Sequence, residues 1–205
     1  MFFGLINSIH SLKVINFQLL PQNLYIRIVI NFILYTLVIM ENNQPISFTP
    51  KSFIQRITII HLALIIGLLL FAGVTYSTVE TNVLVFDFDS NFFTVIVPAM
   101  AISMAFASNF IFTKKVNELS NVSLLKDKLM GYQTASIIRF ALLEGPAMFS
   151  IVIYMLTGNL LFLIMAGVLI VYFITIRPTK EKIEMELNLN FEHKATFNQM
   201  DEEIK

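Results

Sequence analysis

Four long apolar stretches dominate this chain and restrict the folds open to it. A helix needs about 20 mostly apolar residues to cross the ~30 Å hydrocarbon layer of a membrane, because its backbone must satisfy its own hydrogen bonds there. Hydrophobic residues make up 56% of the chain and charged residues 14%, whereas about a quarter of the residues in soluble domains are charged. The sequence therefore predicts an all-α membrane protein with four transmembrane helices, at about 57–76, 92–112, 135–156 and 160–176.

The charges between these spans predict how the helices are oriented. Basic residues near the ends of spans stay in the cytoplasm. The charged residues of the loop at 77–91 are all acidic. We therefore expect an inner (plasma) membrane protein in which both flanking segments, a leader at 40–56 and a tail at 177–205, are cytoplasmic. The short turn at 157–159 makes the last two spans an antiparallel hairpin, so the bundle is expected to consist of two hairpins. The basic residues behind this prediction are Lys51, Arg56, Lys114, Lys115, Lys126, Lys128, Arg177, Lys180 and Lys182.

Residues 1–39 do not fit the four-span pattern. They contain no acidic residue and no alanine. One interpretation is that translation starts at Met40 and that the first 39 residues are upstream sequence. The other is an additional N-terminal helix, either interfacial or a fifth span at about 24–40 that Arg27 interrupts. A signal peptide is disfavoured, because no small-residue cleavage site follows the apolar part.

Several functional classes are disfavoured by what the sequence lacks. The 14 basic residues balance 14 acidic ones, and no basic patch is long enough to predict nucleic-acid binding. Without cysteine there is no thiolate nucleophile or cysteine-ligated metal. The three histidines are scattered, and the metalloprotease, serine-hydrolase and phosphate-loop motifs are absent. We expect no enzyme activity, no metal site and no cofactor; the expected partners are the lipid bilayer and either a second copy or another membrane protein.

The first and third spans resemble each other at an offset of 78 residues. Eight of nineteen positions are identical between residues 58–76 and 136–154, which suggests a parallel internal repeat; the alternative is that two Leu/Ile-rich spans simply look alike. Both copies contain an Ala-xxx-Gly pair, and small residues let membrane helices approach closely. We therefore expect packing through Ala63, Gly67, Ala141, Gly145 and Pro146. The small residues of the second span predict that it is the central helix; they are Ala99, Ala101, Ser103, Ala105, Ala107 and Ser108.

Glu144 is the main candidate for a functional group. At 1.5 Å per residue it lies about 12 to 14 Å beyond the start of the third span, near the midplane of the membrane. A charge there costs from ~3 to more than 10 kcal/mol, so the carboxyl is expected to be protonated and to serve either structure or ion transfer. Pro146 should kink the helix beside it, and Glu144 could hydrogen-bond the carbonyl of Leu142 that Pro146 leaves free.

The expected partners of Glu144 lie on neighbouring spans. They are His61, Ser103, Ser108 and Asn109. Arg139 is not expected to pair with it, because five helical residues turn the two side chains about 140° apart. Arg139 should instead extend to the cytoplasmic headgroups. His61 taken alone is more typical of a satisfied packing residue than of a ligand.

One stretch resembles a known family. ALLEGPAMFSIVIYML, preceded by a charged loop and a helix rich in small residues, is similar to the carboxylate-bearing helix of the rotary ATPase proteolipid, the c subunit. This resemblance covers residues 92–156 and implies that Glu144 corresponds to the ion-binding carboxylate. The second span lacks that family's dense glycine pattern, and Pro146 is foreign to it. The chain as a whole resembles small four-span proteins of bacterial inner membranes, which implies no specific activity.

Outside the spans, three structural predictions follow. Residues 183, 185, 187, 189 and 191 alternate with polar residues at strand spacing, so the tail could pair with residues 46–48 as a small ribbon. The alternative is an amphipathic tail on the headgroups. Residues after Lys194 are expected to be disordered. Residues 123–132 should form an interfacial helical turn, with its leucines facing the membrane and its charges facing water.

Two functional hypotheses remain from the sequence. The first is a non-enzymatic structural or assembly component of the inner membrane. The second is a small proton- or ion-coupled membrane protein that uses Glu144.

Overall fold

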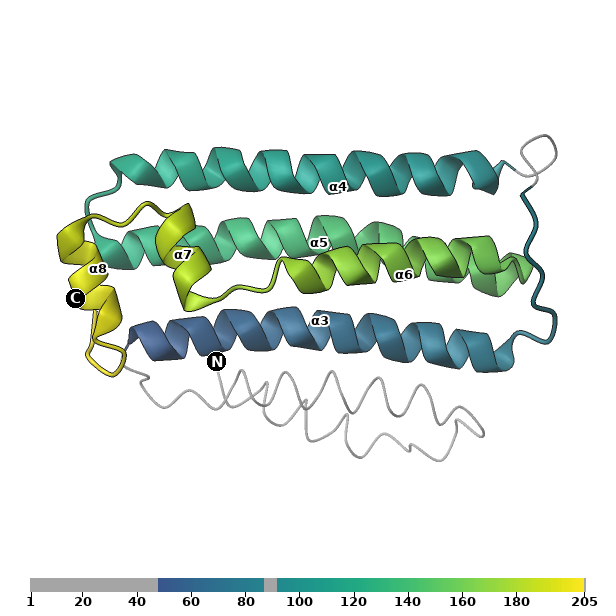
Figure 1. Ribbon diagram of the computed structural model, residues 1–205, viewed down its shortest axis with the longest axis horizontal. Helices are drawn as coiled ribbons and strands as arrows, with labels where there is room; N and C mark the ends of the chain where they lie inside the picture. The colour runs from purple at the N-terminus through teal and green to yellow at the C-terminus, as the bar shows by residue number, and fades with distance from the viewer. Residues whose placement is uncertain (1–47, 87–91, 205) are drawn as a thin grey trace, which may run out of the picture. The chain divides into compact units, whose positions relative to one another are not determined.

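The computed structural model describes residues 48–86 and 92–204, which form a helical bundle with a helical cap at one end (Figure 1). Among them no strand forms, and the only bridge pairs Val83 with Asn159. The elements are α3 (Pro50–Thr78), α4 (Phe93–Glu118), the 3-10 helix η2 (Leu119–Asn121), α5 (Leu125–Thr157), α6 (Leu160–Thr175), α7 (Lys180–Glu186) and α8 (Phe191–Asn198). The all-α class is confirmed.

Three of these helices are long and apolar enough to cross a membrane. They are α3, with 29 residues, α4 together with η2, with 29, and α5, with 33. Within residues 48–86 and 92–204, a fourth span results only if α6 and α7 count as one, although they are bent by 82° at the break between them. The 16 residues of α6 reach about 24 Å, which is short of the ~30 Å hydrocarbon layer. The helices indicate a membrane protein, and the described residues hold three or four of its spans, where the sequence predicts four for the same region.

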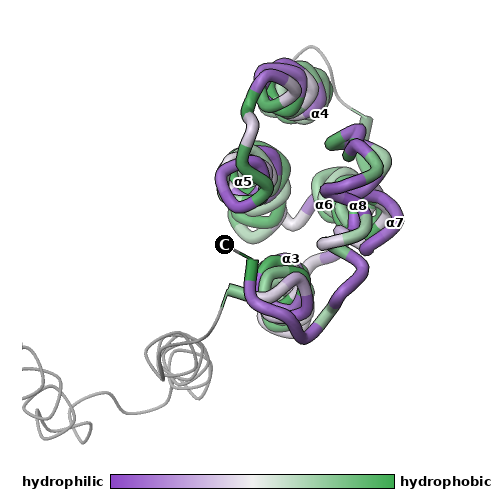
Figure 2. The backbone as a smooth tube through the Cα atoms, turned by 90° about the vertical axis from the view of Figure 1, so that its left-hand side faces the viewer, coloured by the Kyte–Doolittle hydropathy of each residue, from purple (hydrophilic) through white to green (hydrophobic). Residues whose placement is uncertain are grey.

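The central helix of the bundle is α5. Seen along the helices, α5 lies between α4 and α3, and α6 lies beside it (Figure 2). In the most apolar part of α5, 44% of the residues are buried, against 22% in each of α3 and α4. The prediction that the second span is central is therefore wrong. Large side chains determine the centre: Leu143 and Ile151 of α5 and Phe173 of α6 are completely buried.

The two Ala-xxx-Gly pairs do not bring the described helices together as expected. Among the described residues, no atom lies within 4 Å of where a Cβ would stand on Gly67 or Gly145. Ala141 and Gly145 are exposed and Ala63 is half-buried, while Pro146 is buried. The contacts between described helices therefore do not depend on close approach at either Ala-xxx-Gly pair. α5 runs without interruption through Gly145 and Pro146.

Two helices begin earlier than hydropathy predicts. α3 begins at Pro50, inside the expected leader, because Thr49 and Ser52 form a reciprocal capping box and proline suits the first helical position. α5 begins at Leu125, so the residues from 125 to 132 are helical as expected, and they form the first two turns of α5. Leu125, Leu129 and Tyr132 are all buried. Their spacing places them on the face of α5 that continues into the bundle core.

The C-terminal segment forms two capped helices, and the expected ribbon is wrong. Thr179 caps α7 and Asn190 caps α8, each through its side-chain oxygen. Ile183 and Leu187 are buried, whereas Met185 is 73% exposed and Phe191 is 92% exposed. The two buried residues, Ile183 and Leu187, are four positions apart, which is the spacing of a helix and not of a strand. We refer to α7, α8 and the residues through 204 as the terminal cap.

The terminal cap is ordered beyond Lys194, contrary to expectation. Phe197 and Ile204 are buried in the same core cluster as Phe53 of α3. The backbone N–H of Lys51 donates to the carbonyl of Met200, and that of Ile204 donates to the carbonyl of Phe48. The tail does contact the segment before α3, but through residues 200–204; Ile46 lies outside the described residues.

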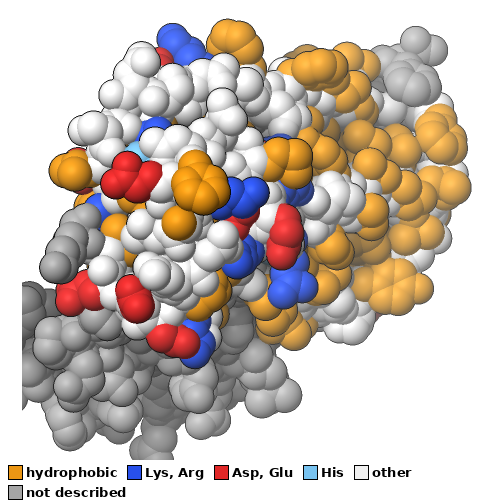
Figure 3. Space-filling model, turned by 60° about the vertical axis from the view of Figure 1, so that its left-hand side comes forward, with side chains coloured by type: hydrophobic (Ala, Val, Ile, Leu, Met, Phe, Trp, Pro, Cys, Tyr) orange, Lys and Arg blue, Asp and Glu red, His pale blue; other side chains and the backbone are white. Residues whose placement is uncertain are grey.

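Charged side chains gather at the end of the bundle that carries the terminal cap, and apolar side chains cover the flank (Figure 3). We call this the basic end; Lys51, Lys114, Lys126 and Lys180 belong to it. At the opposite end, Asn159 holds the chain after α3, donating to the carbonyl of Val85 at 2.8 Å and accepting from its N–H at 3.3 Å. Asp87 and Asp89 lie outside the described residues.

Candidate functional site

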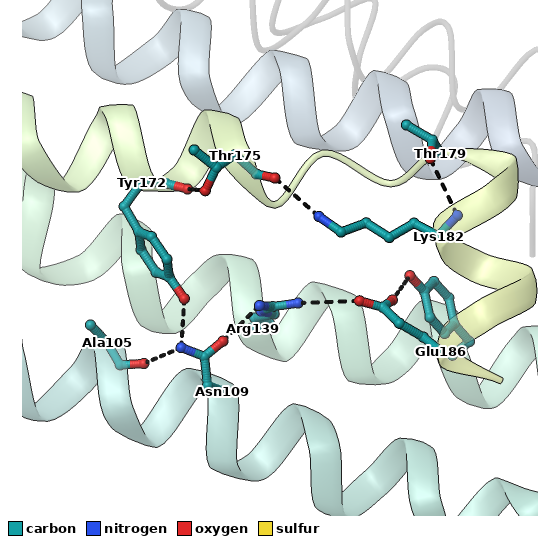
Figure 4. A network of polar contacts seen from close by, with 9 residues as sticks. Ala105, Asn109, Arg139, Tyr172, Thr175, Thr179, Lys182 and Glu186 are labelled. Carbon is teal, nitrogen blue, oxygen red and sulfur yellow. Dashed lines mark hydrogen bonds and ion pairs between the residues drawn. The ribbon is translucent and has the colours of Figure 1, made fainter. Parts of the chain in front are cut away.

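Arg139 lies at the centre of a polar network inside the basic end (Figure 4). Its guanidinium donates from Nη2 to Oδ1 of Asn109 on α4 at 2.6 Å. The same guanidinium stands over the ring of Phe112, 4.5 Å from its centroid, an arrangement that attracts a cation to an aromatic face. Its side chain is only 13% exposed. The side chain of Arg139 is therefore folded between the helices instead of extending freely along the surface of the bundle.

Asn109 connects Arg139 to a third helix. Its side-chain nitrogen donates to Oη of Tyr172 on α6 at 2.5 Å and to the carbonyl of Ala105, one turn back on its own helix, at 3.2 Å. One amide thus contacts α4, α5 and α6 at the same depth. Asn109 was predicted to be a partner of Glu144, but its side chain is used by Arg139 and Tyr172.

Glu186 brings the terminal cap into the network. Tyr132 of α5, itself buried, donates its hydroxyl to Oε2 of Glu186 at 2.6 Å. Oε1 of Glu186 lies 4.0 Å from Nη1 of Arg139. A charge-assisted hydrogen bond would place these two atoms about 2.7 to 2.9 Å apart. The two opposite charges therefore face each other without a direct hydrogen bond.

A small cavity opens beside this separated pair. It has a volume of about 240 Å³, and its lining comes from three helices: Phe112, Thr113, Val116 and Asn117 of α4, Arg139 of α5 and Glu186 of α7. A guanidinium has five N–H groups, and Asn109 accepts from one of those on Arg139. Nε of Arg139 is buried and has no hydrogen-bond partner within the described part of the chain. The cavity thus combines an incompletely satisfied cation, a carboxylate and an aromatic wall.

Glu144 lies on the same helix as Arg139 but outside this network. Its side chain is half-buried. Among residues 48–86 and 92–204, it has no hydrogen-bond or ion-pair partner. In the turn at Pro146, the hydroxyl of Ser150 donates to the carbonyl of Pro146 at 2.7 Å. Glu144 makes no such bond to this turn. The structure therefore leaves the carboxyl of Glu144 uncommitted within the described part of the bundle.

The other residues expected to approach Glu144 have different partners. His61 is buried, with Nε2 2.9 Å from the carbonyl oxygen of Phe173 and its ring against Phe140 and Phe173. The hydroxyl of Ser103 donates to the carbonyl of Met100, and that of Ser108 to the carbonyl of Ala105. These are packing and helix-internal contacts, and they agree with the interpretation of His61 as a packing residue.

The Arg139 network was not predicted from the sequence, although two of its members were noticed separately. The sequence predicts Asn109 as a partner of Glu144 and Arg139 as a residue that does not pair with Glu144. It gives no prediction for Tyr132, Tyr172 or Glu186. A useful signal was available: an Arg within a predicted span is costly unless paired. Comparison of the chain with family models, curated proteins and solved structures finds no match.

Proposed function

We propose that this protein is a non-enzymatic structural or assembly component of the inner membrane, with the terminal cap on the cytoplasmic side. The observation that supports this most directly is the Arg139 network, whose side chains join α4, α5, α6 and α7. Positive residues at the basic end favour its cytoplasmic placement. Under this proposal, the two hairpins form an anchor and the cap presents a fixed surface to a partner.

The exposed side chains of the cap support a role in assembly. Phe191 is 92% exposed and Met185 is 73% exposed, although the neighbouring Ile183, Leu187 and Phe197 are completely or almost completely buried. We propose these two side chains as the contact positions of the terminal cap. The partner would be a second copy or another membrane protein.

Site-specific photocrosslinking in intact cells tests this proposal. A photoreactive amino acid at Met185 or Phe191 should give a discrete higher-mass protein adduct. The matched control is Phe106 of α4, which is 75% exposed but lies on the apolar flank, where lipid is the expected neighbour. If neither cap position gives a protein adduct and the purified protein conducts ions, the structural role is wrong.

A second candidate function is proton or ion coupling through Glu144. It is supported by the uncommitted carboxyl and by the resemblance of residues 92–156 to the rotary ATPase proteolipid. A hydrophobic carbodiimide modifies protonated carboxyls in apolar surroundings, so it should label Glu144 at neutral pH while Glu203, which is exposed, remains unmodified. In proteoliposomes, Glu144→Gln should abolish ion flux under this function; under the structural role, the wild type and the variant both show no flux above empty vesicles.

A further inference from the structure

The cavity beside Arg139 lies at the depth where a membrane helix meets the lipid headgroups. The apolar part of α4 from Phe93 to Thr113 is about 31 Å long at 1.5 Å per residue, close to the ~30 Å hydrocarbon thickness. Thr113 lines the cavity, and the next two residues are Lys114 and Lys115. The cavity is therefore at the boundary between acyl chains and headgroups.

A second hollow continues from this cavity along the outer face of α4. Its volume is about 510 Å³, and it shares Thr113 and Asn117 with the first. Phe110, Lys114, Glu118 and Asn121 also line it. An apolar side chain on the membrane side and a lysine on the water side match the two parts of a phospholipid, so a lipid lying against α4 could place its headgroup in the inner cavity.

The charges in the inner cavity define the headgroup that fits. Nη1 of Arg139 donates to no described residue, and Oε1 of Glu186 lies 4.0 Å from it. An isolated anion would meet the carboxylate, and an isolated cation would meet the guanidinium, so each alone is disfavoured. A group carrying a phosphate and a primary ammonium satisfies both: the phosphate accepts from Arg139 and the ammonium donates to Glu186.

We propose that the cavity lined by Arg139, Glu186 and Thr113 binds the zwitterionic headgroup of a phosphatidylethanolamine. The volume agrees, because about 240 Å³ is many times the ~10–15 Å³ that one water molecule needs in a cavity, which leaves room for a phosphoethanolamine group. The same chemistry exists in soluble phosphoethanolamine, but the position at the headgroup boundary and the adjoining hollow on α4 favour the lipid. This inference does not depend on the structural role proposed above.

Native mass spectrometry of the delipidated full-length protein tests the site. The protein is titrated with phosphatidylethanolamine, phosphatidylcholine and phosphatidylglycerol of the same acyl chains. We expect phosphatidylethanolamine to bind about tenfold more tightly than the other two, because choline cannot donate hydrogen bonds to Glu186 and glycerol carries no ammonium. Equal binding of all three lipids overturns the proposal. Soluble glycerophosphoethanolamine should not displace the lipid at millimolar concentration; displacement would identify a soluble ligand instead.

Two variants identify the residues responsible. Glu186→Gln removes the charge but keeps an acceptor for Tyr132, so the preference for phosphatidylethanolamine over phosphatidylglycerol should fall about tenfold. The matched control is Glu184→Gln, on the same helix but outside the cavity lining, which should keep the preference. Thr113→Phe fills the cavity and should weaken binding of the headgroup without unfolding the protein, as measured by thermal melting. A preference that survives Glu186→Gln, or that Glu184→Gln abolishes equally, refutes the assignment.

Discussion

The contact between Tyr132 and Glu186 should hold the terminal cap on the bundle, and its strength can be measured. Tyr132→Phe removes only the hydroxyl, which donates to Oε2 of Glu186 at 2.6 Å. The ring remains against Phe53 and Phe112, with centroids 6.5 and 5.6 Å away. The substitution thus removes the contacts of the hydroxyl with Glu186 and Ser136 and leaves the ring in place.

The expected cost follows from the burial of the two groups. A hydrogen bond to a charged group contributes about 1.5–3 kcal/mol. The Glu186 side chain is 24% exposed, so water partly replaces the lost donor and the lower end of this range applies, ~1.5 kcal/mol. For a chain of this size that corresponds to a fall in Tm of roughly 3–6 °C, at ~2–4 °C per kcal/mol.

A double-mutant cycle separates this contact from other effects. Tyr132→Phe, Glu186→Ala and the double variant are unfolded thermally in the same detergent, and the coupling free energy is taken from the three differences. We expect a coupling of about 1 kcal/mol or more, since contacting residues couple by ~0.5–3 kcal/mol. Tyr76→Phe serves as the control, because Tyr76 is 53% exposed and should change stability by less than ~0.5 kcal/mol. A coupling near zero would show that α7 does not dock on α5 as described.

Three further predictions concern the glycines and the cap. Gly145→Ala should not destabilise the bundle and should raise its stability by up to ~1 kcal/mol through helix propensity, because the new Cβ meets no described atom within 4 Å; a loss above ~1 kcal/mol in thermal melting would show that Gly145 is a packing site. Gly158→Ala should destabilise by ~1–3 kcal/mol, because φ is +65° and the new Cβ would stand 2.4 Å from the carbonyl oxygen of Thr81; a neutral melting profile would contradict this turn geometry. Phe197→Ala should release the cap, since removal of a buried Phe costs ~3–5 kcal/mol, and limited proteolysis should then cut after residue 177; resistance equal to wild type would refute the role of Phe197.

Hydropathy was sufficient to find the apolar helices α3, α4, α5 and α6 because the membrane requirement is local. Each span must satisfy its own backbone hydrogen bonds and present an apolar surface, and both properties can be read from a window of about 20 residues. The ends of the helices were less predictable. α5 continues outward to Leu125 because Leu129 and Tyr132 pack on α3, α4 and the cap, and such tertiary contacts leave no hydropathy signal.

The tail shows how local periodicity can mislead. The alternation at residues 183 to 191 indicates a strand, yet a strand without a neighbouring sheet cannot satisfy its backbone. The caps at Thr179 and Asn190 and the buried pair Ile183 and Leu187 stabilise helices instead. The helix-capping residues are present in the sequence. Whether capping or the alternating pattern determines the structure depends on the core that the helix covers, and the sequence alone does not show that core.

By itself, the sequence determined where the long apolar helices among the described residues lie, that they suit a membrane, and that lysines flank them at one end. The tertiary structure alone decided which helix is central and which polar residues meet. Arg139, Asn109, Tyr132, Tyr172 and Glu186 come from four helices, and the spacing that brings them together depends on how large side chains pack across α5. The physical reason is that hydrophobicity acts over short windows of sequence, whereas hydrogen bonds and ion pairs depend on ångström distances between residues far apart in the chain.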